Sequence, residues 1–93
     1  MGKVSAGGKE YIIAFSSFYK AAYAQDMLSE AGINATLRKL PTELVRSCGT
    51  GLYMRSESAK PAQLVFAEKQ ISPRGIYEIN RGGGGEKNYI KIK

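Results

Sequence analysis

The chain has 93 residues, enough for one small domain, with 43% hydrophobic residues and a formal net charge of +6. It contains no histidine and a single cysteine, Cys48, which excludes imidazole-dependent hydrolase chemistry within one chain, an internal disulfide and a cysteine-based zinc site. A lone cysteine is typical of a reducing compartment, and residues 1–10 do not resemble a signal peptide. No apolar run approaches the ~20 residues that span a bilayer, so we expect a cytoplasmic protein.

The first third of the chain predicts a strand followed by a helix. Residues 1–9 are rich in glycine and without periodicity, which predicts a flexible leader, whereas 10–15 (EYIIAF) form an apolar run typical of a buried strand. Ser16 and Ser17 are candidate N-caps for a helix over 18–31, and Gly32 is placed to end it in a left-handed conformation. The apolar face of this helix comprises Ala21, Ala24 or Gln25, Leu28 and Ala31.

The middle of the chain predicts two strands joined by an irregular link. Residues 33–40 alternate apolar and polar side chains, the pattern of a half-buried strand, and Pro41 ends it. The link over 41–51 contains Cys48, and 52–55 (LYMR) predict the next strand.

The last third predicts a helix, a strand and a tail. Ser58 is the expected N-cap of a helix that reaches Lys69 or Gln70, with Pro61 in its first turn. The buried positions of this helix are expected among Leu64, Val65, Ala67 and Ile71. Residues 76–80 alternate as a strand, and 89–92 have strand character that predicts either disorder or addition to a sheet edge, in this molecule or a neighbour.

The resulting order, β-α-β-β-α-β, predicts an α+β ferredoxin-like sandwich, in which two helices cover one face of an antiparallel sheet. We expect one domain over 10–81, followed by a flexible, glycine-rich and basic C-terminal tail over 82–93. Open sheet edges and the strand-like tail make a homodimer a candidate assembly.

Cys48 is the candidate functional residue, because it lies beside glycine in a polar link rather than in an apolar run. Backbone N–H groups of such a segment can form an anion-binding nest, here from Ser47, Gly49, Thr50 and Gly51. Positive charge would come from Arg46, Arg38 and Arg55. Such surroundings lower the pKa of a thiol from ~8.5, which predicts a reactive thiolate.

Two other interpretations remain open. Free cysteines are often buried as small hydrophobes, so the domain could instead be a non-catalytic ligand-binding or regulatory module with a structural cysteine. Six tyrosines and the basic charge could also indicate RNA stacking on a sheet face, although strand and helix tyrosines usually pack in the core or at its rim. Because the positive charge is spread along the chain and partly terminal, we rank nucleic acid last. The acidic residues show no paired spacing for acid/base work, and no metal site or cofactor is indicated.

Four segments together resemble the selenium/sulfur carrier protein-like family of small bacterial and archaeal proteins. They are 11–17 (YIIAFSS), 30–33 (EAGI), Pro41 and Glu43 leading to 47–49 (SCG), and 75–79 (GIYEI). The chain departs from the family pattern at Arg46, at Thr50 and in the basic tail.

The resemblance implies a carrier rather than a turnover enzyme. Cys48 would accept sulfur or selenium as a persulfide or selenopersulfide from a donor such as a cysteine desulfurase, and would pass it to an acceptor protein. Thiolate attack on a persulfide depends on pKa and access, not on a catalytic triad, so the lack of histidine is no obstacle.

Overall fold

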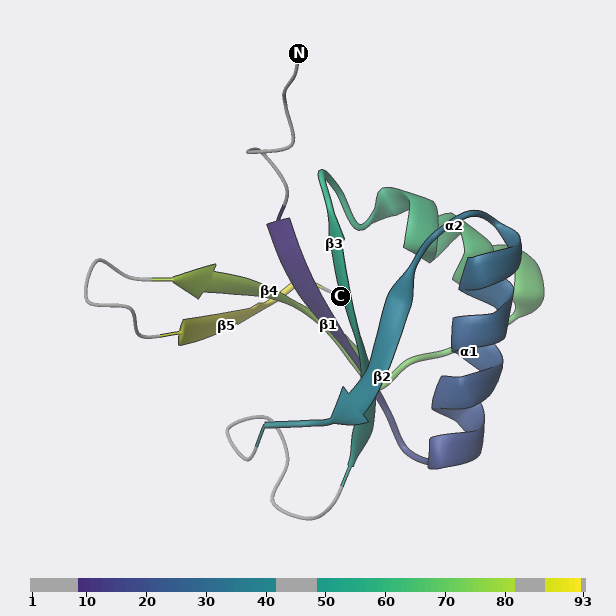
Figure 1. The fold of residues 1–93 in the computed structure, drawn as a ribbon, viewed down its shortest axis with the longest axis horizontal. Coiled ribbons are helices and arrows are strands. Elements are labelled where there is room, and N and C mark those ends of the chain that lie inside the picture. Colours follow the sequence, from purple (N-terminus) through teal and green to yellow (C-terminus); the bar gives the residue numbers. More distant parts are fainter. Residues whose placement is uncertain (1–8, 42–48, 82–86, 93) are drawn as a thin grey trace.

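A computed structural model of the chain describes residues 9–41, 49–81 and 87–92. Figure 1 shows an α+β fold with the helices on one side of a twisted sheet. The elements in chain order are β1 (Lys9–Phe15), α1 (Phe18–Glu30), β2 (Ala35–Lys39), β3 (Thr50–Ser56), α2 (Lys60–Lys69), β4 (Gly75–Arg81) and β5 (Lys87–Lys91). The predicted order of strands and helices is therefore confirmed, and the leader, apart from Lys9 in β1, lies outside the described residues.

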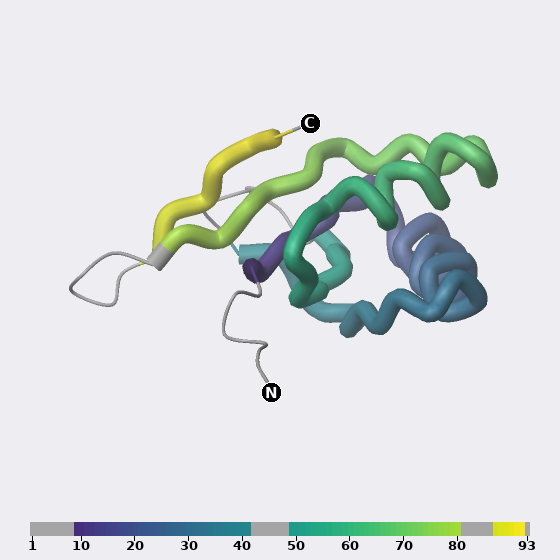
Figure 2. Tube along the Cα trace, turned by 90° about the horizontal axis from the view of Figure 1, so that it is seen from above, coloured from purple at the N-terminus to yellow at the C-terminus, as the bar shows by residue number. Residues whose placement is uncertain are grey.

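The five strands form one antiparallel sheet in the order β2-β3-β1-β4-β5. Each helix connects two parallel strands that are separated by one antiparallel strand, which is the split-βαβ arrangement of a ferredoxin-like sandwich. Both helices lie against the same face of the sheet, as the view from above in Figure 2 shows. The predicted fold class is thus confirmed.

The main core lies between the helices and the sheet. Strand residues at alternate positions, including Ile13, Phe15 and Leu52, are almost fully buried there against Ala21, Ala24 and Leu28 of α1. The small alanines let α1 approach the sheet closely. From α2, Phe66 meets Phe15 edge to face with ring centroids 6.2 Å apart, a favoured aromatic geometry.

The opposite face of the sheet, which no helix covers and which we call the open face, carries a smaller apolar cluster. Ile12, Ala14 and Leu40 are buried in it. Partly buried side chains from the other strands surround them: Tyr53, Tyr77, Ile79 and Tyr89. Strand alternation therefore gives both faces apolar content, with the larger share on the helical side.

The ends of α1 follow its sequence signals. The Ser17 hydroxyl accepts a hydrogen bond from the backbone N–H of Lys20 at 3.2 Å, and Gly32 has the left-handed φ of 84° expected after a helix. Ala31, predicted to face the core, is instead the exposed C-cap residue, because the helical face ends one turn earlier at Leu28.

The start of α2 differs by one residue from the prediction, whereas its end at Lys69 is confirmed. The N-cap residue is Ala59, not Ser58, although the Ser58 hydroxyl still accepts a 3.1 Å hydrogen bond from the N–H of Lys60. Val65 is buried as expected and Ile71 partly so, whereas Leu64 is 70% exposed because it lies on the outer face of the helix.

The prediction of a flexible tail is wrong for Lys87–Lys91, whereas the stated alternative, addition of this segment to a sheet edge in the same molecule, is confirmed. These residues form β5, which pairs with β4 in the same molecule with Ile79 opposite Tyr89. The half-buried Tyr89 joins the apolar cluster of the open face, and Ile92 N–H donates to Ile76 O at 2.8 Å. Packing and main-chain pairing together order a segment that is too short and polar to be stable alone.

Candidate functional site

The link that contains Cys48 begins and ends at one point of the sheet. The backbone N–H of Leu40 donates a 2.9 Å hydrogen bond to the carbonyl oxygen of Gly49, directly beyond the Lys39–Thr50 pair of the β2–β3 ladder. Leu40 is buried on the open face, which anchors this end of β2. Arg46, Ser47 and Cys48 lie outside the described residues, and Cys48 is bonded directly to Gly49.

The predicted anion nest is described only from Gly49 onward. Thr50 and Gly51 belong to β3, where they pair with Lys39 and Arg38 on one side and with Phe15 and Ala14 on the other. A central strand directs its N–H groups to its neighbours and not into a single concavity. Among the nest residues that the structure describes, Gly49 is therefore the one outside the strand pairing.

Gly51 serves close packing. It is buried, and a Cβ at this position would lie 2.9 Å from the carbonyl oxygen of Ile13 and still closer to the side chain of Leu40. Glycine can serve either a positive φ or a close approach of neighbouring atoms. Gly51 does not have a positive φ, so it serves the close approach of Leu40 and of the Ile13 backbone.

The two described cations among those expected around Cys48, Arg38 and Arg55, lie at different points along the sheet. Arg38 lies opposite Gly51 in the β2–β3 register, and its guanidinium carbon lies 5.4 Å from the centroid of the Tyr53 ring. Arg55 lies five residues along β3 from Thr50, about 16 Å at the rise of a strand. There it forms a 2.9 Å ion pair with Glu10. The structure therefore brings Arg38, but not Arg55, to the region of the link.

Helix α1 also contributes to this end of the molecule, which no local pattern in the sequence indicated. Phe15 pairs with Thr50, so the N-terminus of α1, three residues after Phe15, lies at the sheet end from which the Cys48 link emerges (Figure 1). A helix N-terminus carries partial positive charge, which favours a nearby anion. The cap residues Ser16 and Ser17 indicated where the helix starts, but nothing local in the sequence indicated its neighbour.

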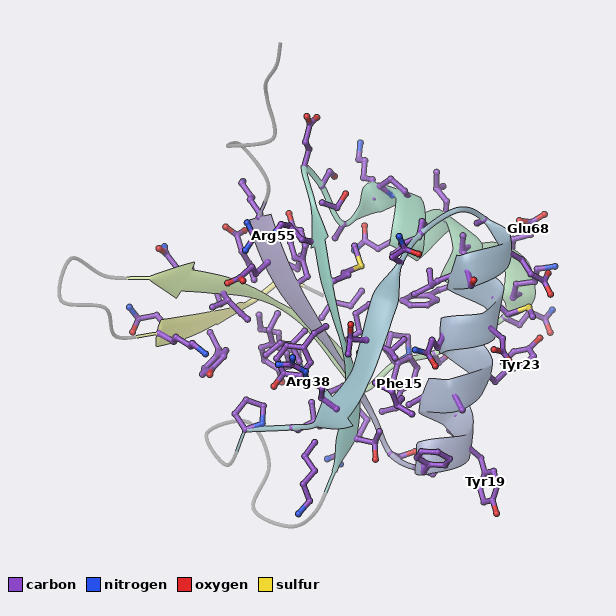
Figure 3. All side chains as sticks on the ribbon, in the orientation of Figure 1. Phe15, Tyr19, Tyr23, Arg38, Arg55 and Glu68 are labelled. Carbon is purple, nitrogen blue, oxygen red and sulfur yellow. The ribbon has the colours of Figure 1, made fainter. Side chains whose placement is uncertain are left out.

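Two aromatic side chains are exposed at the same end. Phe18 and Tyr19, the first two residues of α1, are 55% and 83% exposed, and their rings meet edge to face. Figure 3 shows Tyr19 pointing away from the sheet. Neither residue contributes to the core, so two aromatic rings are exposed at the N-terminal end of α1.

The described part of the chain shows neither a cluster of metal ligands nor a membrane-spanning helix. Within residues 9–41, 49–81 and 87–92, no three cysteine, aspartate or glutamate side chains gather as metal ligands would. No helix among those ranges is long and apolar enough to cross a bilayer.

Comparison with protein families adds the functional information that geometry alone lacks. A family model described as "Putative Se/S carrier protein-like" matches residues 10–78. The match begins in β1 and ends within β4, so it includes Cys48 in sequence and leaves β5 outside. No curated protein and no solved structure matches the chain.

Proposed function

Because the chain belongs to the Se/S carrier protein-like family, we propose that it carries sulfur or selenium on Cys48 for transfer to an acceptor protein. The observation that carries this proposal is the family match over residues 10–78, which contain the chain's one cysteine. A carrier needs one nucleophilic sulfur and no general base of its own, a requirement that a chain without histidine meets.

In the proposed cycle, the Cys48 thiolate attacks the terminal sulfur of a donor persulfide. A sulfur–sulfur bond forms at Cys48, and the bond between the two donor sulfurs breaks, so that the donor leaves as a thiolate with the electron pair. A nucleophile of the acceptor protein then attacks the terminal sulfur and releases Cys48 as a thiolate. Selenium would travel as the terminal atom of a selenopersulfide by the same exchange. A cysteine desulfurase is a suitable donor, because it presents sulfur as a persulfide.

The surroundings of the link support a negatively charged sulfur. The positive end of α1 lies at the same end of the sheet as the link. Arg38 lies two residues before Leu40, where the link begins. In the proposed site, Ser47 and Gly49 supply backbone N–H groups and Arg46 supplies charge, while Thr50 and Gly51 hold the end of the segment in β3. A lowered thiol pKa would follow from these groups.

The experiment is a loading assay read by intact mass. The protein is incubated with a cysteine desulfurase and free cysteine, and its mass is recorded before and after reduction with dithiothreitol. We expect the wild type to gain one sulfur that dithiothreitol removes, and Cys48→Ser to gain none. No added sulfur on the wild type, or the same gain on Cys48→Ser, would refute the proposal.

A second measurement separates the carrier from a module with a structural cysteine. Native protein is treated with iodoacetamide at neutral pH, with urea-unfolded protein as the reference for full reactivity. A carrier thiol should be alkylated at a rate similar to or above that of the unfolded chain. A Cys48 that reacts only after unfolding would favour the structural alternative.

A further inference from the structure

Among the described residues, the open face carries more positive than negative charge. A shallow depression of about 330 Å³ lies on it, and the basic residues that line it are Arg38, Arg55 and Lys87. Glu10 is the one acidic residue among those lining the depression, and Arg55 already pairs with it at 2.9 Å. The other acidic residues that the structure describes lie on the helices, before α2 or on the helical side of β4: Asp26, Glu30, Glu57, Glu68 and Glu78.

Aromatic rings accompany these cations. Tyr53, Tyr77 and Tyr89 come from three different strands and lie partly buried on the open face. The guanidinium carbon of Arg38 lies over the Tyr53 ring, 5.4 Å from the ring centroid, which is within the range of a cation–π contact. Figure 3 shows Arg38 and Arg55 on the side of the sheet away from Tyr19 and Tyr23 of α1.

We propose that the open face binds single-stranded nucleic acid. The phosphates would pair with Arg38 and Lys87, and unpaired bases would stack on the Arg38–Tyr53 platform and the neighbouring rings. An acidic peptide would use the cations but has no use for stacked planar groups, and the bases of a duplex are not free to stack on a sheet. This activity does not use Cys48, although Arg38 also belongs to the surroundings of the Cys48 link, and it depends on none of the residues outside the described ranges.

The test is fluorescence anisotropy of the full chain with 5′-labelled oligonucleotides of about ten nucleotides, as RNA and as DNA. We expect binding at low salt that weakens as salt rises, with a log–log slope of about −1.4 for the two phosphate contacts of Arg38 and Lys87 to a single strand. An abasic oligonucleotide of equal length and charge separates base stacking from plain charge attraction. It should bind about tenfold more weakly, since stacking contributes strongly per base.

Matched variants locate the surface. Arg38→Gln with Lys87→Gln removes two charges from the open face, and Lys60→Gln with Lys69→Gln removes two from α2. We expect about a tenfold loss and a shallower salt slope for the first pair, and less than a twofold change for the second. Tyr53→Leu, which keeps an apolar side chain, should weaken the normal oligonucleotide about fivefold and leave abasic binding unchanged.

Three outcomes would overturn the proposal: no binding at low salt, equal affinity for normal and abasic strands, or equal loss in the two charge pairs. Circular dichroism of each variant confirms that the fold is intact. If Tyr53→Leu fails to fold, Arg38→Lys replaces it as the test of stacking, because lysine keeps the charge but loses the planar group. Cys48→Ser should bind as the wild type does, so failure of this proposal and failure of the carrier function are distinguishable.

Discussion

The side chain of Leu40 packs directly over Gly51, across the β2–β3 pair and at the point where the Cys48 link joins the sheet. Leu40 is also held by its N–H hydrogen bond to Gly49 O, and its side chain is buried with Ile12 and Ala14 on the open face. This contact ties the end of β2 to the start of β3, and its tightness makes Gly51 sensitive to any added atom.

We predict that Gly51→Ala destabilises the protein by about 2–3 kcal/mol. The new Cβ would collide with Leu40 and with the carbonyl oxygen of Ile13, and the latter is backbone that cannot move freely. Urea unfolding followed by circular dichroism measures the change. The control is Gly75→Ala, where the Cβ would meet the ring of Tyr77 at 3.0 Å. Because a ring can shift, Gly75→Ala should lower the free energy of unfolding by only about 1 kcal/mol. An equal loss at both positions would show that Gly51 is not the more tightly packed of the two glycines.

Gly32 should be sensitive for a different reason. Its φ of 84° is left-handed, yet a Cβ there would meet no atom within 4 Å. Gly32→Ala should therefore cost about 1–2 kcal/mol of unfolding free energy through backbone strain alone. Gly32→Asn, which tolerates this conformation better, should cost clearly less. A neutral Gly32→Ala in thermal or urea unfolding would show that the end of α1 does not require a left-handed residue.

The helix cap at Ser17 should contribute measurably to the stability of the protein. Ser17→Ala removes the acceptor for the N–H of Lys20 and should lower stability by about 1 kcal/mol. Ser17→Asp should restore most of it, because a carboxylate both accepts the bond and favours the positive end of the helix. The neighbouring exposed residue provides the control: Ser16→Ala is expected to change the unfolding free energy by less than about 0.5 kcal/mol.

The assignment of β5 is testable by truncation after Arg81. Loss of the pairing with β4 and of the Tyr89 contact should cost about 1–2 kcal/mol. It should also expose the edge of β4, so we expect concentration-dependent association in analytical ultracentrifugation. Tyr89→Ser, which removes the packing and keeps the strand, should show part of the stability loss and no association. A truncated chain as stable as the full one would argue against a structural role for β5.

Local patterns in the sequence determined the elements and their order. An apolar run identified β1, and alternation identified β2 and β4. Three- and four-residue spacing identified α1, and Ser17 and Gly32 marked its two ends. From that order the ferredoxin-like sheet follows, because each helix must return its strand to the same sheet with a fixed hand. Composition alone likewise left Cys48 as the one thiol on which carrier chemistry could depend.

Tertiary structure decided which residues meet. Pairing register, which joins residues as far apart as Arg55 and Glu10, placed Arg55 in an ion pair at the far end of β3 rather than beside the link. The same pairing brought α1 to the end of the sheet that bears the link, and it put Tyr53, Tyr77 and Tyr89 on one face. No local pattern encodes such contacts, because a short segment defines its own periodicity but not the strand that will lie beside it.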